Sequence, residues 1–159
     1  MKLNYEEGAW FAVPVTAGGY GVGIVARAGK RGRVLLGYFF KSRYETVPSL
    51  LDVALLRPGD AGLVARFGDL YLIENRWPVI GKSPEWDRMN WPMPVFLRRD
   101  EIVGGAWEVR YSDTDPRSVV SEERVQQALG NDWIAQAGLW RDGLFGAEAI
   151  EYALEKMMA

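Results

Sequence analysis

The apolar positions in the first two-thirds of the chain follow the two-residue period of β-strands. Residues 19–27 alternate most clearly, with Gly19, Gly21 and Gly23 on one face and larger side chains on the other. A face without side chains needs a close neighbour, so we expect a ring from an adjacent strand to lie against these glycines. Similar short apolar runs predict strands over residues 9–15, 33–40, 61–68, the start of 68–81, 93–99 and 106–112.

Three other segments have the period of helices, and a fourth is ambiguous. Residues 46–56 have Thr46 as a candidate cap and an apolar face made of Leu50, Leu51, Ala54 and Leu55. Residues 121–130 begin with a candidate serine cap followed by two glutamates, which favour the start of a helix. Residues 146–159 predict a last helix, and residues 132–140 fit a short helix or a strand.

A run of strands followed by helices is typical of α+β proteins. We predict a mostly antiparallel, strongly bent sheet or partly open β-barrel in the first two-thirds of the chain, with helices at the C-terminus. The length of 159 residues favours a single domain, residues 1–159. Within it we expect a β-rich core over residues 8–112 and a helical extension over residues 113–159 that packs on this core.

The composition excludes several kinds of chemistry. The chain has no cysteine and no histidine, which removes disulfides, thiolate nucleophiles, Ser-His-Asp catalysis and most zinc sites. We assign no metal site, because the carboxylates lack the spacing of a known metal-binding loop. No apolar run is long enough to span a bilayer and no signal peptide is visible, so we expect a cytoplasmic protein with no membrane partner.

Basic residues surround a predicted hairpin tip at residues 28–32 and would suit phosphate contacts in a small DNA-associated barrel. They are Arg27, Lys30, Arg31 and Arg33. A charged tip that keeps a hairpin soluble is more common. The net charge of −2 also gives no reason to expect nucleic acid as a partner. Residues 112–159 are more acidic than the rest of the chain, which would suit a basic partner but is more often a solvated face.

Residues 77–96 concentrate aromatic residues and prolines. This stretch holds three tryptophans and four prolines, out of seven and eight in the chain. Proline stiffens the backbone, so a ring on such a loop loses little entropy on binding. Tryptophan and arginine are also enriched at the energetic centres of protein interfaces. The candidate partner-binding residues are therefore Glu85, Trp86, Asp87, Arg88, Trp91 and Trp77.

The same rings have a structural alternative, in which they fold inward and close one end of the core. The remaining tryptophans are expected to be structural. Trp10 and Trp107 lie in strand patterns and should be in the core, whereas Trp133 and Trp140 should dock the helices on the sheet. A further alternative is a carbohydrate-binding or glycoside-processing site, which would need rings facing a cleft with two carboxylates across it. We assign no catalytic residue.

Two segments carry motifs of a known family. Residues 11–14 and 19–25 show an F-A-[I/V]-P strand and a G-Y-G-x-G-x-[V/I] strand. Residues 77–81 and 91–96 show W-x-x-I-G followed by W-P-x-P-x-F. In order and approximate spacing, these motifs resemble the immunity protein 26 family, over about residues 8–112. The family often has an acidic residue where this chain has Ala9 and Trp10.

The resemblance implies a small, mostly β, cytosolic protein that binds a cognate toxin domain of a bacterial polymorphic toxin system and blocks it stoichiometrically. It implies no catalysis and no cofactor, and we expect a monomer or weak homodimer. The contact residues come from composition, not from the family. On this interpretation Trp86→Ala and Arg88→Ala should weaken partner binding more than stability, whereas Trp91→Ala should unfold the protein.

Overall fold

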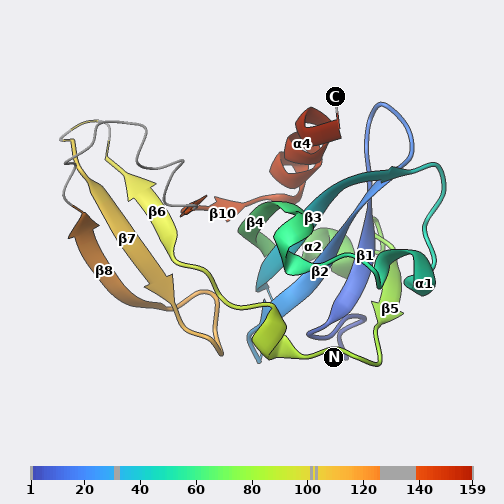
Figure 1. The fold of residues 1–159 in the computed structure, drawn as a ribbon, viewed down its shortest axis with the longest axis horizontal. Coiled ribbons are helices and arrows are strands. Elements are labelled where there is room, and N and C mark those ends of the chain that lie inside the picture. Colours follow the sequence, from blue (N-terminus) through green and yellow to red (C-terminus); the bar gives the residue numbers. More distant parts are fainter. Residues whose placement is uncertain (1, 31–32, 101, 103, 126–138, 159) are drawn as a thin grey trace.

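The structure is a computed structural model that describes residues 2–30, 33–100, 102, 104–125 and 139–158. In this part of the chain the strands form two sheets, which lie next to each other in Figure 1. Each sheet has two different end strands, so neither closes into a barrel. The α+β class and the mostly antiparallel pairing are confirmed. That residues 1–159 form a single domain stays a prediction.

The larger sheet has six strands: β1 (Ala9–Pro14), β2 (Tyr20–Ala28), β3 (Val34–Tyr44), β4 (Ala61–Gly68), β5 (Val79–Lys82) and β10 (Leu144–Phe145). Their order is β10-β4-β3-β2-β1-β5. Strands β1 to β4 pair antiparallel in succession, and β5 pairs antiparallel with the other side of β1. Strand β10 is parallel to β4.

The smaller sheet has the order β8-β7-β6-β9. Its strands are β6 (Phe96–Arg99), β7 (Ala106–Tyr111), β8 (Val119–Val125) and β9 (Trp140–Arg141). The described helices are α1 (Leu50–Val53), α2 (Leu70–Ile73) and α4 (Ala147–Met158), with 3-10 turns η1 (Pro58–Asp60) and η2 (Arg88–Asn90). Figure 1 shows α4 above the larger sheet and α1 at the right, beside β5.

Both faces of the larger sheet are apolar. Successive residues of a strand point to opposite faces, so the neighbours Trp10 and Phe11 belong to different core clusters. The first cluster contains Phe11, Phe39, Phe67 and Trp77, and α4 covers it with Ile150 and Leu154. The second cluster contains Trp10, Ile24, Phe40 and Trp91, and the smaller sheet contributes Phe96, Val109 and Tyr111.

The expected contact between rings and the glycine face of β2 is confirmed. A Cβ atom on Gly23 would lie 2.6 Å from Phe11 Cζ and 2.8 Å from Phe39 Cδ1. A Cβ on Gly21 would lie 2.7 Å from Met158 Cε of α4. The glycines are therefore a packing device that lets rings and a helix approach the sheet backbone.

Two predicted elements near the sheet are different in the structure. The helix predicted over residues 46–56 is a single turn, and Ser49 rather than Thr46 caps it through a reciprocal bond with Asp52. The segment predicted to continue as a strand after Gly68 forms the single-turn helix α2. Asn75, with a φ of 59°, lies directly after this turn and breaks the strand pattern.

The helix predicted over residues 121–130 is also wrong in its described part, because residues 119–125 form β8. The sequence Ser-Glu-Glu is locally suited to a helix start, but pairing with β7 decides the structure. Arg98 is bonded to Glu122 at 2.9 Å, and Arg110 contacts Glu123 at 3.9 Å. Residues 126–130 lie outside the described residues. The last predicted helix is confirmed as α4.

The four remaining tryptophans have different environments. Trp10 is in the core, as expected, with 2% of its surface exposed. Trp107 is only partly buried, and the guanidinium groups of Arg98 and Arg124 each lie 5.7 Å from its ring centre. Trp140 lies in β9, where it pairs with Phe96 of β6. Residues 132–138, which include Trp133, lie outside the described residues.

Because aromatic rings lie so close to β2, adding a single methyl group at Gly23 should destabilise the fold. We expect Gly23→Ala to lower stability by about 1–3 kcal/mol, because the new Cβ would overlap Phe11 and Phe39. Thermal unfolding followed by circular dichroism would measure it. Gly59→Ala is the matched control, since a Cβ there meets no atom within 4 Å. Equal melting temperatures for the two variants would contradict this packing.

Candidate functional site

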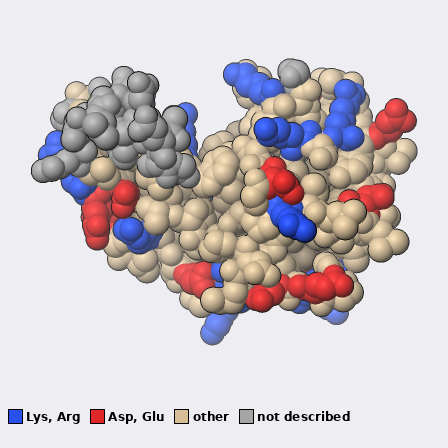
Figure 2. All heavy atoms as spheres, in the orientation of Figure 1, with Lys and Arg blue, Asp and Glu red and all other residues tan. Residues whose placement is uncertain are grey.

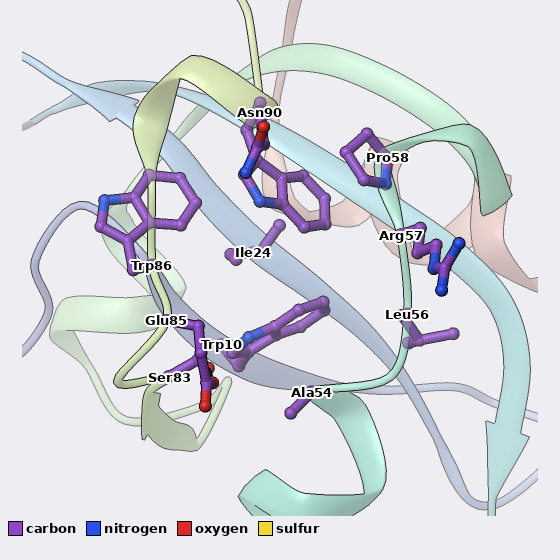
Figure 3. A pocket seen from close by; sticks show the side chains of 11 residues that line it. Trp10, Ile24, Ala54, Leu56, Arg57, Pro58, Ser83, Glu85, Trp86 and Asn90 are labelled. Carbon is purple, nitrogen blue, oxygen red and sulfur yellow. Dashed lines mark hydrogen bonds between the residues drawn. The ribbon is translucent and has the colours of Figure 1, made fainter.

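A pocket of about 380 Å³ (Figure 3) opens on the face of the larger sheet that carries the second core cluster, called the second face from here on. Strands β1 and β2 provide its floor through Trp10 and Ile24. The segment from α1 to η1 forms one wall, and the segment from β5 to η2 forms the other. The lining residues are Trp10, Ile24, Ala54, Leu56, Arg57, Pro58, Ser83, Glu85, Trp86, Asn90 and Trp91.

Three indoles form the aromatic part of this pocket. Trp91 lies edge-on to Trp10, with ring centres 5.8 Å apart and planes at 88°. Trp86 stacks on Trp91 at 6.2 Å and 29°. Trp10 and Trp91 are buried, with 2% and 8% exposure, whereas Trp86 is only partly buried. Trp86 is therefore the indole of this group that is most available to a partner.

Backbone features hold the Trp86 loop in place. Gly8 has a φ of +93°, and a Cβ there would lie 2.7 Å from Trp86 Cγ, so the ring rests directly on the Gly8 backbone. The carboxylate of Asp87 accepts a bond from the Met89 amide and caps η2. Tyr38 donates its hydroxyl proton to the Pro92 carbonyl at 2.7 Å, and burial raises the pKa of this phenol to about 12.

Arg88 points into an ion-pair network instead of the pocket. Its guanidinium bonds to Glu7 at 2.6 Å and to Asp113 at 2.9 Å. Asp113 also bonds at 2.7 Å to Arg27, which is buried and donates to the Arg88 carbonyl. The hydrogen bond from Arg27 and the nearby guanidinium charges hold the pKa of Asp113 below its usual value. These contacts join η2 to the N-terminal segment and to the β7–β8 turn.

The predicted site residues are thus divided among three locations. Glu85, Trp86 and Trp91 line the pocket, and the exposed Asp87 follows them in the same loop. Arg88 belongs to the ion-pair network. Trp77 lies in the core on the opposite face, where it stacks on Phe11 at 5.6 Å with parallel planes. Its Nε1–H donates to Glu151 of α4 at 3.2 Å. The alternative in which the rings fold into the core therefore applies to Trp77, which is fully buried, and to Trp91, which is 8% exposed.

The α1 segment is the part of the site that the sequence did not identify. Leu51 and Leu55 were predicted to belong to an apolar helix face, yet they are 84% and 83% exposed. Leu55 lies between Ala54 and Leu56, which line the pocket, and Leu51 belongs to α1 just before them. The apolar residues predicted for this segment are therefore partly on the surface, because Leu51 and Leu55 are exposed instead of buried.

The hairpin tip offers fewer basic groups than its sequence suggests. Arg27 is only 3% exposed and is paired with Asp113. Lys30 and Arg33 are exposed, and Arg31 lies outside the described residues. Among the described residues, no group of three or more acidic side chains is placed to hold a metal ion. None of the described helices combines the length and apolarity needed to cross a membrane.

The fold and the pocket define a small α+β protein with an aromatic site on its surface. The model of the immunity protein 26 family matches residues 6–108, more than half of the chain, and the protein belongs to this family. The resemblance seen in the sequence motifs is thereby confirmed. Searches of curated proteins and of solved structures found no match.

The different burial of two pocket indoles predicts different effects on stability. Trp91→Ala should cost about 3–5 kcal/mol, because it empties a volume shared with Trp10, Tyr38 and Phe40. Trp86→Ala should cost less, about 1–2 kcal/mol, since the ring is partly exposed already. Urea unfolding of the two variants beside the parent protein would measure both. Equal losses would contradict this assignment.

The network around Asp113 predicts a dependence of stability on pH. Because the pKa of Asp113 is lower in the folded state, its ion pairs stabilise the protein above the unfolded pKa of about 4. This stabilisation is lost as the pH falls through the folded pKa. Asp113→Asn should therefore melt below the parent at pH near 7, and the difference should shrink at pH near 3. A difference in melting temperature that is constant over this range would contradict the role of the charge.

Proposed function

We propose that the protein is a bacterial immunity protein of a polymorphic toxin system, which neutralises its cognate toxin domain in the cytoplasm by stoichiometric binding and without catalysis. We place the contact on the indole surface, defined as the pocket together with the exposed side chains of Leu51, Leu55 and Met89. Membership of the immunity protein 26 family supports the kind of function. The position of the surface rests on the geometry of the pocket.

The observation that carries this position is that the two segments forming the walls of the aromatic pocket also hold large exposed apolar side chains. Leu51, Leu55 and Met89 are 84%, 83% and 78% exposed, and they belong to the two segments that form the pocket walls. Exposed apolar patches on monomers often mark binding sites, and these side chains are the candidates for such a patch. Rigid tryptophans surrounded by apolar side chains are also the usual composition of an interface hot spot.

The chemistry of the pocket supports binding without catalysis. Glu85 is the only carboxylate among its lining residues, so the pocket lacks the pair of acids that a glycoside hydrolase requires. The chain contains no histidine or cysteine to act as a base or nucleophile. Neutralisation by covering a toxin's functional surface needs neither.

The contacts of Arg88 change what its substitution should do. Its guanidinium is paired with Glu7 and Asp113, so Arg88→Ala would release η2 and disturb the loop as a whole. We therefore use Trp86, and not Arg88, to test the binding surface. Leu55→Ala is a second test variant on the opposite wall, because this side chain has almost no native contacts to lose.

Calorimetric titration against the toxin domain encoded beside the gene tests the proposal. We expect tight, saturable binding that abolishes the toxin's activity, weakened about tenfold or more by Trp86→Ala, which corresponds to about 1.4 kcal/mol. Tyr152→Ala is the control, since this ring is 60% exposed on α4, which covers the other face of the sheet. Its affinity should equal that of the parent.

Two results would contradict the proposal in different ways. If Trp86→Ala and Leu55→Ala bind like the parent while Tyr152→Ala binds weakly, the contact surface is on α4 and not on the indole surface. If no product of the neighbouring genes binds, the immunity function itself fails. Binding in a glycan screen would then support the carbohydrate alternative.

A further inference from the structure

In the two segments that form the walls of the indole pocket, unpaired acidic side chains outnumber unpaired basic ones. Four exposed carboxylates belong to the segments that form its walls: Asp52 in α1, Asp60 in η1, and Glu85 and Asp87 in the segment before η2. Arg57 is the basic residue among the lining residues of the pocket. Figure 2 shows acidic side chains, with some basic ones beside them, along the lower edge of the molecule.

Each of these carboxylates accepts a hydrogen bond from a group in its own segment. Asp52, Asp60 and Asp87 accept bonds from the backbone amides of Ser49, Arg57 and Met89, and Glu85 accepts one from the Ser83 hydroxyl. All four donors are neutral. Within the described part of the chain, none of the four forms an ion pair. The wall segments also hold the cations Arg88 and Lys82, but Arg88 is paired with Glu7 and Asp113, and Lys82 with Glu6.

We propose that the indole pocket holds a basic side chain, arginine or lysine, from the toxin domain. This inference rests on the proposed function and adds the chemistry of the partner surface. The face of an indole attracts a cation through its quadrupole, and tryptophan is the strongest aromatic residue in this respect. The methylene groups of arginine or lysine suit the apolar lining, while the charged end meets the carboxylates of the rim.

The positions of the two charged lining residues agree with this occupant. Figure 3 shows Arg57 on one wall, extending away from Trp10 and Trp86, and Glu85 on the other wall near Trp10. A cation inside the pocket would approach Glu85 without meeting the Arg57 guanidinium. Acidic groups around the pocket would also accelerate association with a basic partner, an effect that weakens as salt is added.

A small probe tests the pocket independently of any toxin. N-acetyl-arginine amide would be titrated into the protein while the indole N–H signals of its tryptophans are followed by NMR. The neutral analogue N-acetyl-citrulline amide and the apolar N-acetyl-leucine amide are the matched ligands. We expect the signals of Trp10, Trp86 and Trp91 to move with the arginine probe, and that of Trp77 to stay, because Trp77 lies on the other face of the sheet.

Two neutralising variants give predictions of opposite sign. Glu85→Gln should weaken binding of the arginine probe about fivefold, and Arg57→Gln should strengthen it by removing the repelling charge. Both side chains are exposed, so neither change should affect folding. Neither variant should alter the response to the leucine probe. If leucine or citrulline binds as well as arginine, or if Arg57→Gln weakens arginine binding, the proposal is wrong.

The complex with the toxin domain separates this proposal from the proposed function. Glu85→Gln should lower the affinity for the toxin domain about fivefold, and raising the salt from about 50 mM to about 500 mM should reduce the difference. Toxin binding that depends on Trp86 but not on Glu85 would overturn the basic occupant and leave the immunity function standing. Arginine binding without toxin binding would leave the pocket chemistry standing and overturn the function.

Discussion

The structure depends on a sheet that is aromatic on both faces. Alternation along β1 sends Trp10 to one face and Phe11 to the other, and β3 does the same with Phe40 and Phe39. Each face needs its own cover, because large aromatic side chains contribute to stability only where water is excluded. Helix α4 supplies one cover. The smaller sheet and the segment that ends at Trp91 supply the other.

This constraint explains why so many tryptophans and prolines occur in residues 77–96. The segment passes the β5 edge of the larger sheet and contributes one ring to each face. Trp77 stacks on Phe11 beneath α4, and Trp91 packs against Trp10 on the opposite side. Between these two anchors the chain is held at both ends, and the intervening Trp86 is only partly buried. A partly exposed indole on a fixed loop is what a binding surface needs.

Periodicity predicted the parts of the fold that are decided locally. The glycine face of β2 is visible in the sequence because its two-residue spacing can serve only a strand. The signal failed where short patterns are compatible with two structures. Four residues from Leu70 fit one helical turn or a strand, and the acidic start of β8 imitates a helix N-terminus. In β8 the pairing with β7 outweighs local preference, and pairing partners are not visible in a single sequence.

The candidate site was predictable only in its composition. Trp86, Glu85 and Trp91 were identified because tryptophan, charge and proline occur together in the sequence. That Arg88 would pair with Glu7, and Trp77 with Glu151, depends on contacts more than 70 residues apart in the chain. The exposure of Leu55 was not predictable for a related reason. An apolar helix face is expected to pack against another surface, but the sequence does not show whether that surface belongs to the same chain or to a partner.

The family match includes the indole pocket and excludes helix α4. The match covers residues 6–108 and so includes the whole indole pocket, from Trp10 to Trp91. Helix α4 lies outside the match, yet Ile150 and Leu154 are fully buried in the first core cluster. The face beneath α4 is thus already covered by the chain itself, whereas the other face keeps exposed leucines around an open aromatic pocket. These two facts support the proposed position of the partner contact on the face of the second core cluster, within the part of the chain that the family model matches.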